Sequence, residues 1–424
     1  MKAGRIEHIK NSPLGMIPAD WDIMSIGNSL NEIYRYPTYF NIKYVESGVP
    51  EIRGELIKED GTIEENDKAY RYISKETANR FPRVHLEPND FVMSVRGTMG
   101  KIAIVPERLR GAVITANLIR MKFVKSFIEP KWIRHYLISE FFQEALDLAT
   151  SATTIKTIQV PQLCAINFIR PPINEQRRIA EILDAIDEAI QKTEALISKL
   201  KAIKQGLLHD LLTRGLDEAG KLRDPKAHPE QFKDSPLGKI PKEWQFGSIN
   251  NLAVNHDSRR IPLKQADRDK RQGDYPYYGA SGIIDWIDEY LFDGDYVLLG
   301  EDGENIVSRE LPLAFRVSGK FWVNNHAHIF DPLPGVDIQF FTELLEYTDY
   351  NKIVIGSAQP KLTQEGLGKL LFKIPTPSEQ TRIADMLEAH DTRISAEEQY
   401  RDKLKLQKKG LMHDLLTGKV RVKV

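Results

Sequence analysis

The sequence predicts a mixed α+β chain in which two globular α/β domains are joined by a pair of long antiparallel coiled-coil helices. Three observations predict this architecture: a tandem internal repeat, two long stretches with apolar residues at heptad spacing, and two unlike blocks with short strand patterns. The repeat implies pseudo-two-fold symmetry. A length of 424 residues exceeds one ordinary domain, so more than one hydrophobic core is expected.

The first repeated motif opens each half of the chain. Residues 11–21 read NSPLGMIPADW, and residues 234–244 read DSPLGKIPKEW, 223 positions later. Pro fixes φ and Gly permits positive φ, so both copies predict a rigid turn. We expect Trp21 and Trp244 to anchor the segments that follow.

The second repeated motif lies further along each half. Residues 174–184 (NEQRRIAEILD) match residues 378–388 (SEQTRIADMLE), and residues 206–213 (GLLHDLLT) match residues 410–417 (GLMHDLLT). Both matches are displaced by 204 positions, so the two strings belong to one repeated element. The chain is a tandem duplication in which residues 1–20 complete what the C-terminal helix leaves open. The expected segments are an N-terminal segment (1–20), a first block (21–172), a first long helix (173–214), a connector with the repeated opening motif (215–243), a second block (244–375) and a second long helix (376–424).

The two long helices carry heptad stripes. Eight of ten seam positions are apolar in the first copy and six of ten in the second. The expected apolar seam residues are Ile179, Leu183, Ile186, Ile190, Ile197, Leu200, Leu207 and Leu211 in the first helix, and Ile383, Leu387, Ile394, Leu404, Leu411 and Leu415 in the second. Two independent helices lying on their own domains are the alternative, but a helix of about 40 residues is ~60 Å long and exceeds a small domain's diameter. If the two blocks bind DNA, a rod of that length would hold the segments they contact no more than ~15 base pairs apart.

The two blocks read as short strands separated by Gly, Asn and Asp turns, with one helix in each. The strands expected are Phe91–Val95, Ile102–Val105, Val113–Ala116, Tyr296–Leu299, Ile306–Val307 and Phe321–Asn324, and the helices are Lys131–Leu148 and Ile338–Tyr347. Residues 89–93 (NDFVM) resemble residues 294–298 (GDYVL), a faint echo between otherwise divergent inserts.

Several turns carry candidate DNA-contacting side chains. In the first block these are Arg96, Thr98 and Lys101, whose turn lacks the spacing of a nucleotide-binding phosphate loop, and Lys156. In the second block they are Tyr278, Ser281, Asn325, His326, Gln359 and Lys361. Strand periodicity puts His326 and His328 on one face, but no Cys or acidic residue stands at ligand spacing, so no metal site is assigned. A structural aromatic cluster around Tyr278 and an ordinary strand face at the histidines are the alternatives. No catalytic residue is assigned.

Composition limits the classes of protein that the chain resembles. No apolar run is long enough to span a membrane, no secretory signal is evident, and a single cysteine excludes an internal disulfide framework, so we expect a cytoplasmic protein. The formal net charge is −1. Residues 22–170 hold 20 Lys and Arg against 18 Asp and Glu, and residues 245–377 hold 13 against 19. Proteins that hold DNA alone usually carry a basic excess, so a DNA reader of this composition needs partners.

The paired Pro-Leu-Gly-x-Ile-Pro-x-x-Trp motifs, the paired Glu-Gln helix starts and the paired Gly-Leu-x-His-Asp-Leu-Leu-Thr ends resemble the specificity subunit of Type I restriction-modification systems. The resemblance covers essentially the whole chain. It implies two target-recognition domains that each read half of a split, asymmetric site in double-stranded DNA. It also implies helices that dock DNA adenine methyltransferase subunits, and a motor-nuclease restriction subunit as a further partner. S-adenosylmethionine, ATP and magnesium would then belong to the partner subunits, with no cofactor in this chain.

No Asn-Pro-Pro-aromatic methyltransferase motif, Walker motif or nuclease constellation is recognisable, so we expect a non-catalytic subunit. A coiled-coil adaptor whose globular domains bind proteins or ligands is the alternative, and it would also explain the helices and the acidic second block. An assembly that only methylates, without the nuclease subunit, is a nearer alternative.

Overall fold

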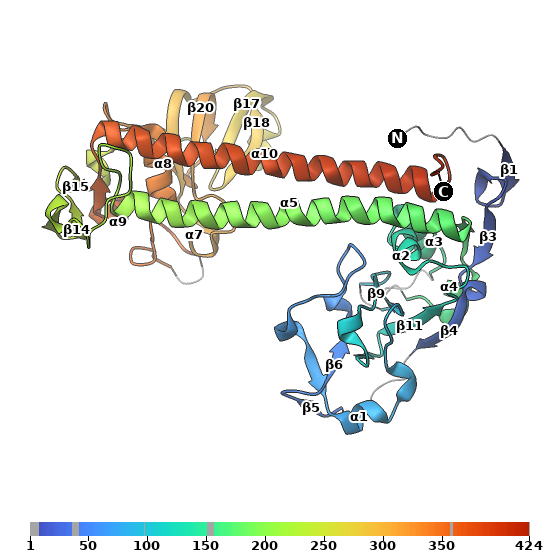
Figure 1. Cartoon of the computed structure of the whole chain (residues 1–424). Coiled ribbons are helices and arrows are strands. Elements are labelled where there is room, and N and C mark those ends of the chain that lie inside the picture. Colours follow the sequence, from blue (N-terminus) through green and yellow to red (C-terminus); the bar gives the residue numbers. More distant parts are fainter. Residues whose placement is uncertain (1–7, 36–41, 97, 151–156, 357–358, 424) are drawn as a thin grey trace. The chain divides into compact units, whose positions relative to one another are not determined.

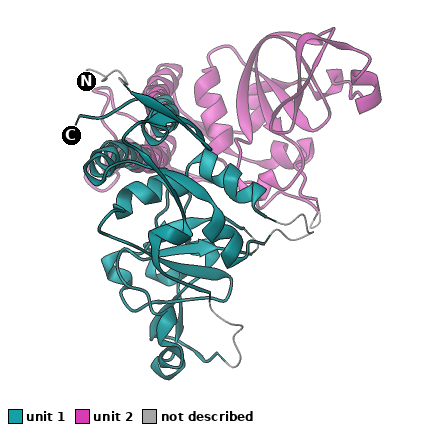
Figure 2. Cartoon of the chain, turned by 90° about the vertical axis from the view of Figure 1, so that its right-hand side faces the viewer, with its two compact units in different colours: residues 1–194, 399–424 teal, residues 195–398 magenta. Residues whose placement is uncertain are grey.

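The computed structural model describes residues 8–35, 42–96, 98–150, 157–356 and 359–423. The chain divides into two compact units, one formed by residues 1–194 with 399–424 and the other by residues 195–398 (Figure 2). Two long helices, α5 (Ile173–Thr213) and α10 (Pro377–Leu416), each begin in one unit and end in the other (Figure 1). Each unit therefore contains one globular block and part of both helices, and the expected α+β architecture is confirmed.

The block of the first unit contains two four-stranded sheets, with strand orders β4-β11-β8-β9 and β10-β6-β7-β5. All four residues of β8 are buried, as expected for an apolar strand covered on both faces. The strands are β4 (Leu30–Arg35), β5 (Tyr44–Val45), β6 (Val49–Ile52), β7 (Arg71–Ile73), β8 (Phe91–Ser94), β9 (Ile102–Ile104), β10 (Val113–Ile114) and β11 (Leu118–Phe123). The helices are α1 (Lys75–Asn79), α2 (Pro130–Leu137), α3 (Glu140–Leu148) and α4 (Val160–Ala165).

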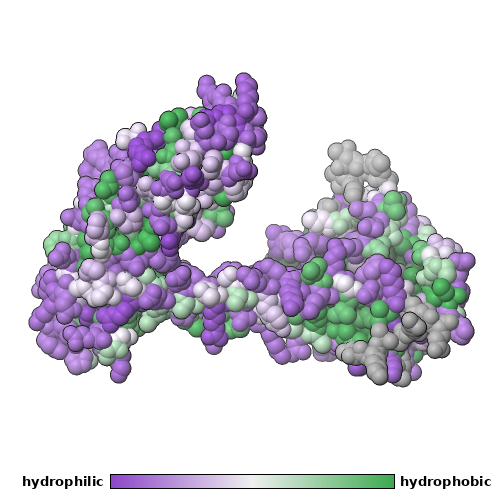
Figure 3. Space-filling view, turned by 90° about the horizontal axis from the view of Figure 1, so that it is seen from above, coloured by the Kyte–Doolittle hydropathy of each residue, from purple (hydrophilic) through white to green (hydrophobic). Residues whose placement is uncertain are grey.

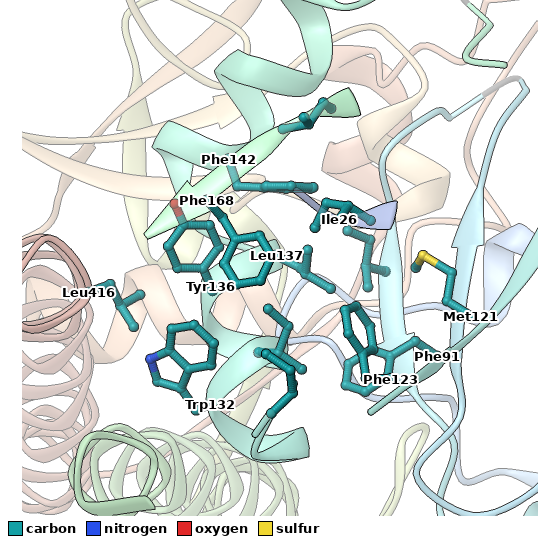
Figure 4. Packing of buried hydrophobic residues seen from close by; sticks show 14 of the residues in the cluster. Ile26, Phe91, Met121, Phe123, Trp132, Tyr136, Leu137, Phe142, Phe168 and Leu416 are labelled. Carbon is teal, nitrogen blue, oxygen red and sulfur yellow. The ribbon is translucent and has the colours of Figure 1, made fainter. Parts of the chain in front are cut away.

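The main core of this block includes the end of the C-terminal helix. Trp132 and Tyr136 of α2 pack with Phe168 of β12 (Asn167–Arg170), and the ring centroids of Tyr136 and Phe168 lie 5.6 Å apart (Figure 4). Leu416, at the end of α10, belongs to the same buried cluster. Residues from both ends of the first unit's sequence therefore share one core.

The block of the second unit is built on one six-stranded sheet with the order β16-β21-β19-β20-β17-β18. Helix α8 packs against β19 and β20 through buried side chains that include Phe340 and Leu344. The strands are β16 (Ala253–Asn255), β17 (Gln272–Gly279), β18 (Gly282–Ile287), β19 (Phe292–Gly300), β20 (Ala314–Val323) and β21 (Ala327–Pro332). The helices are α6 (Gln265–Arg268), α7 (Asn305–Ser308), α8 (Ile338–Tyr347) and α9 (Gln364–Lys369).

The repeated opening motifs form two β-hairpins of the same construction. In each tip the glycine, Gly15 or Gly238, has positive φ (99° and 81°), which explains the repeated glycine. The hydroxyls of Ser12 and Ser235 donate hydrogen bonds to the carbonyls of these glycines at 2.5 and 2.6 Å. The strands are β1 (Ile9–Ser12), β2 (Gly15–Pro18), β13 (Phe232–Ser235) and β14 (Gly238–Pro241).

Each globular block is closed by a two-stranded antiparallel ladder between its first and last strands. In the first unit β3 (Asp22–Ser25) pairs with β12, and in the second β15 (Gln245–Gly247) pairs with β22 (Phe372–Ile374). A long helix begins a few residues after β12 and after β22. We call the repeated parts of the chain, which are the hairpins, the two ladders and the two long helices, the frame. Each block thus leaves the frame and returns to it through equivalent strands.

A buried glutamate near the start of α5 joins three parts of the first unit. Glu175 accepts a hydrogen bond from the indole Nε1 of Trp21 at 2.8 Å, and its other carboxylate oxygen lies 2.7 Å from Nε of Arg421. Arg421 also donates to both carboxylate oxygens of Asp20, at 2.9 and 2.8 Å. We call Trp21, Glu175 and Arg421 the first Trp–Glu–Arg cluster. It ties the C-terminal segment to residues 20–21, as the repeat predicted.

The same cluster recurs in the second unit. Glu379 of α10 accepts from Nε1 of Trp244 at 2.9 Å and from Arg223 at 2.6 Å, and Arg223 also pairs with Glu243 at 3.0 Å. Both tryptophans are fully buried. Trp244, Glu379 and Arg223 therefore form a second Trp–Glu–Arg cluster, so the repeated Trp and Glu-Gln strings have a structural explanation.

The glutamine that follows each glutamate fixes a helix of the adjoining block. The side-chain amide of Gln176 accepts from the backbone N–H of Glu129, just before α2, at 2.8 Å and donates to the carbonyl of Pro171. Gln380 accepts from the N–H of Asp337, just before α8, at 3.0 Å. Both side chains are buried, so the frame positions an equivalent helix in each block.

Ion pairs between α5 and α10 repeat with the same displacement of 204 residues. The four pairs are Asp187–Lys408 (2.6 Å), Asp391–Lys204 (2.7 Å), Glu194–Lys405 (2.8 Å) and Glu398–Lys201 (2.6 Å). The partner's number falls along one helix as it rises along the other, so the helices run antiparallel in each unit (Figure 1). Lys204 and Lys408, two of the six polar seam positions in the heptads, are thus paired across the helices.

The expected apolar seam is buried along most of both helices. Buried members are Ile179, Leu183, Ile190, Ile197, Leu200 and Leu211 in α5, and Ile383, Leu387, Ile394, Leu404 and Leu415 in α10. Ile186, Leu207 and Leu411 are half-buried. The stripe therefore faces the partner helix or the adjoining block.

Three local expectations were wrong. Ile306–Val307 form part of the short helix α7 rather than a strand, because the chain turns at Gly303 and Val307 and Ser308 donate to the carbonyl of Glu304. Only Ile306 is buried there, so strand alternation was misleading. The expected helix Lys131–Leu148 is two helices, α2 and α3, because Ser139 between them has extended backbone and caps back to the carbonyl of Tyr136. The expected strand over Val113–Ala116 ends at Ile114.

None of the helices in the described residues is long and apolar enough to cross a membrane. The visible face in Figure 3 is mainly hydrophilic, with scattered hydrophobic residues.

The two Trp–Glu–Arg clusters provide a matched test of the frame. Arg223→Met should lower the free energy of unfolding by about 3–5 kcal/mol, because it leaves the buried carboxylate of Glu379 without its cation. Arg421→Met should cost less, because the side chain of Arg421 is 26% exposed against 7% for Arg223. Urea unfolding of both variants measures the difference. Equal losses, or none, would contradict this description.

Candidate functional site

The faint echo between the two blocks marks equivalent loops. The strands that contain it, β8 and β19, are central in their sheets. The loop after each strand forms an antiparallel bridge to the segment just before α4 in the first block and just before α9 in the second. The bridges join Arg96 to Thr157 in the first block and Asp302 to Lys361 in the second. Both blocks therefore present the same two segments together. These segments contain the candidates Arg96, Thr98 and Lys101 in the first block and Gln359 and Lys361 in the second.

In the second block, three loops meet at this position. The carboxylate of Asp302 lies 2.8 Å from Nδ1 of His326, and the ammonium of Lys361 lies 3.1 Å from Glu301. Backbone hydrogen bonds fix the loops: Glu301 donates to the carbonyl of His326 at 2.8 Å and accepts from Leu362 at 2.7 Å. We call this group the second-block loop cluster. The side chains of His326 and Lys361 are 48% and 45% exposed, and that of Asp302 is 15% exposed.

The other candidates of the second block divide into two classes. Asn325 and Gln359 are exposed in the loops of this cluster, and Ser281 is exposed in the turn between β17 and β18. Tyr278 is half-buried instead, with its ring 5.7 Å from that of Phe321 in an edge-to-face contact. The structure therefore favours the structural alternative for Tyr278.

The two histidines do not share a strand face, which corrects the expectation from periodicity. His326 lies in the turn before β21 and its side chain is 48% exposed, whereas His328 lies within β21 and is 1% exposed. Nδ1 of His328 lies 2.5 Å from Asp257, and its Nε2 lies 3.2 Å from the carbonyl of Leu362. His328 therefore supports the loop cluster from below.

Asp257 and Glu301 form a charged foundation beneath the surface residues. Burial alone would raise the pKa of Asp257, but the hydrogen bond and charge of His328 outweigh it and lower this pKa to about 2. Burial also opposes ionisation of Glu301, yet Arg260, at 2.6 Å, helps to lower its pKa. Gln364 donates a further hydrogen bond to Asp257 at 2.8 Å. Both acids are thus held ionised and paired.

Asp257, Glu301 and His328 also place possible metal-ligand atoms within 4.8 Å of one another. Arg260 already lies against both carboxylates, at 2.6 Å from Glu301 and 3.4 Å from Asp257. The guanidinium supplies the positive charge that a cation would bring, so the group is well explained as an ion-pair network.

The first block presents a different chemistry at the equivalent loop. Arg96 and Thr98 are exposed after β8, and Lys101 is partly exposed at the other end of the turn. The hydroxyl of Ser94 donates to the carbonyl of Thr98 and accepts from the backbone N–H of Lys101 at 3.0 Å, which closes the turn. Lys156 lies outside the described residues. The first block thus offers cations where the second offers a carboxylate and a histidine.

Sequence reasoning missed Asp302 and the foundation residues Asp257, Arg260 and Glu301. The signal available was the echo between residues 89–93 and 294–298. Three residues beyond the end of the echo stand Arg96 in one block and Glu301, followed by Asp302, in the other. The contact between Asp257 and His328 joins residues 71 positions apart and has no such signal.

Asp257→Ala should disturb the second-block loop cluster without affecting the frame. His328, Arg260 and Gln364 would lose their common acceptor, so the loops around Asp302 and Lys361 should become mobile. Amide hydrogen exchange should accelerate in residues 301–303 and 359–362 and remain unchanged in residues 94–101 of the other block. Unchanged exchange in the loops would refute the foundation role.

The chain matches a family described as Type I restriction modification DNA specificity domain, over residues 19–202 and 241–406. It is 25% identical to a putative type I restriction enzyme MjaX specificity subunit from Methanocaldococcus jannaschii, covering 98% of this chain and 97% of that protein. It is 22% identical to the type I restriction enzyme MjaVIII specificity subunit of the same organism, over 96% of this chain and 94% of the relative.

Two solved structures have a similar fold. One is the S subunit of a Type-I restriction-modification system from M. genitalium, with a TM-score of 0.56 and 16% identity over 93% of this chain and 96% of that one. The other comes from work on complex assembly and conformational transition of the type I R-M system, with a TM-score of 0.58 and 15% identity over 95% and 99% of the two chains. The two matched segments include most of both blocks and both long helices, and the chain belongs to the Type I restriction modification DNA specificity family.

Proposed function

We propose that this chain is the sequence-reading subunit of a Type I restriction-modification complex and that it recognises a split, asymmetric site in double-stranded DNA. The observation that carries the proposal is the duplicated frame, with equivalent Trp–Glu–Arg clusters, ladders and interhelical ion pairs around two unlike blocks. A frame with two-fold symmetry suits the local two-fold symmetry of a duplex, and unlike blocks read unlike sequences.

The surface loops supply side chains suited to this task. Arg96 and Lys101 in the first block have the chemistry for guanine edges or phosphates. In the second block Asp302 can accept from a base amino group, while His326, Asn325 and Gln359 offer hydrogen-bonding groups and Lys361 a phosphate contact. Because equivalent loops carry opposite charge, each block should favour different bases.

Methyl transfer would be performed by partner subunits. DNA adenine methyltransferase subunits would dock on the long helices and bring S-adenosylmethionine. A motor-nuclease restriction subunit would bring ATP and magnesium for translocation and cleavage. The assembly would act in the cytoplasm, and this chain would contribute recognition and spacing rather than catalysis.

An adaptor that binds proteins through its blocks is disfavoured by the family match over both blocks. The adaptor would also not require exposed polar side chains on loops that are bridged equivalently in both blocks. The methylation-only assembly differs solely in its partners.

Substitutions in the equivalent loops should alter different halves of one methylation motif. Arg96→Ala should relax one half, whereas Asp302→Ala or His326→Ala should relax the other, because each removes a side chain from one block; a lost base contact costs about 1–3 kcal/mol. Mapping methylated adenines across the genome of cells that carry each variant measures this. Glu365→Ala, at an exposed position of α9, is the matched control and should leave the motif intact. A motif whose two halves change together would contradict two independent readers.

The isolated chain should bind DNA weakly and with strong salt dependence. Its net charge of −1 leaves little excess cation to neutralise phosphates, so methyltransferase subunits must supply much of the affinity. Fluorescence anisotropy with a duplex containing the mapped motif, with and without the methyltransferase subunit, tests this. Nanomolar specific binding by the chain alone at physiological salt would exclude it.

A further inference from the structure

Both ring nitrogens of His328, beneath the second-block loop cluster, face oxygen atoms of the protein. Nδ1 lies 2.5 Å from a carboxylate oxygen of Asp257, and Nε2 lies 3.2 Å from the backbone carbonyl of Leu362. The side chain of His328 is only 1% exposed. These two oxygens, rather than solvent, therefore decide which ring nitrogens carry protons.

Both oxygens can only accept a hydrogen bond. The carbonyl of Leu362 has no proton to donate. Burial alone would raise the pKa of Asp257, but hydrogen bonds from His328 and Ile329 and the charge of Arg260 lower this pKa to about 2, so the carboxyl is ionised at neutral pH. A neutral imidazole donates from one nitrogen only, and its other nitrogen would direct a lone pair at an acceptor. An imidazolium with both protons is the form that satisfies both contacts.

Charged groups from several elements surround the ring. Asp257 and Arg260 follow β16, and the carboxylate of Glu301, which follows β19, lies 3.8 Å from Nδ1 of His328. Arg260 contacts both carboxylates, and Lys361 lies 3.1 Å from Glu301. With His328 protonated, three cations face two carboxylates. A block that holds 13 Lys and Arg against 19 Asp and Glu thus has a local positive excess beneath its candidate DNA-contacting loops.

The proton on Nε2 ties the segment before α9 to β21. Leu362 directly follows Lys361, and its backbone N–H donates to the carbonyl of Glu301 at 2.7 Å. If the ring lost one proton, Nδ1 would keep its bond to Asp257, because a hydrogen bond to a charged acceptor is the stronger one. Nε2 would then face the carbonyl of Leu362 without a hydrogen bond. The segment that contains Gln359 and Lys361 would lose this attachment.

We propose that His328 is a positioning residue of the second block, whose imidazolium form holds Gln359 and Lys361 where they contact DNA. Loss of one ring proton would release this segment and remove the local positive excess. Recognition of the half-site read by the second block should therefore weaken as pH rises. The equivalent loop of the first block, residues 94–101, contains no histidine, so the other half-site should not respond. This inference rests on the proposed function, because it concerns how one of the two readers is held.

The test uses the complex assembled with its methyltransferase subunit and duplexes that contain the mapped motif or one changed base pair in either half. The ratio of methylation rates measures discrimination at each half, and the first half controls for the pH dependence of methyl transfer itself. Discrimination at the second half should fall by about tenfold as pH rises, as expected for one lost base contact. The midpoint of this fall should coincide with the pH at which NMR of the histidine-labelled chain shows His328 losing a proton.

Two substitutions separate the roles of the ring nitrogens. The amide nitrogen of His328→Gln can donate where Nε2 does, and that of His328→Asn can donate where Nδ1 does, but neither side chain titrates. His328→Gln should keep part of the discrimination at the second half at every pH, whereas His328→Asn should lose it at every pH. His326→Gln is the control for the exposed histidine nearby, and it should leave the pH midpoint unchanged.

A His328 ring that carries only one proton at a pH where the second half is read would overturn the positioning role. So would a pH dependence that survives His328→Gln or disappears in His326→Gln. Each of these outcomes leaves the proposed function intact. A wild-type complex that discriminates at neither half would overturn both.

Discussion

The buried carboxylate near the start of each long helix is the interaction on which the rest of the structure depends. Glu175 and Glu379 each hold a tryptophan indole and an arginine, and each thereby joins a β-hairpin, a helix start and the segment that follows the other helix in the repeat. A buried carboxylate is costly unless it is paired, so the three partners are mutually required. Gln176 and Gln380 follow these glutamates directly, and each glutamine fixes a helix of the adjoining block.

This arrangement separates the requirements of folding from those of recognition. The frame is specified by a few repeated contacts, while each block needs only a pair of strands that leave and return at fixed positions. Within the blocks, buried networks such as that of Asp257 hold the surface loops without contributing to the frame. The readers can therefore differ while the spacing between equivalent contacts in the helices remains the same.

The repeat, the antiparallel helices and most of the seam could be predicted from sequence, because string matches and heptad spacing are local patterns. The pairing of Glu175 with Arg421 could not be predicted. Fewer residues separate Arg421 from the end of α10 than separate Arg223 from the end of α5, so these two arginines are not 204 positions apart as the other repeated residues are. Alternation placed His326 and His328 together, but the turn before β21 removes His326 from the strand. Asn325, His326, Gln359 and Lys361 came together because the loop that follows β19 contacts both the turn before β21 and the segment before α9, which their separation in sequence does not reveal. Which of them contact bases stays a prediction.

The central claim is that the frame is two-fold symmetric and that the blocks alone carry the specificity. Exchanging the segment between β3 and β12 with the segment between β15 and β22 tests it most directly, with methylated adenines mapped in cells carrying the exchanged chain. A symmetric frame predicts that the same duplex motif is methylated, because the exchanged complex is the original one turned about its two-fold axis. A folded, assembled chain that methylates a different motif would contradict the account.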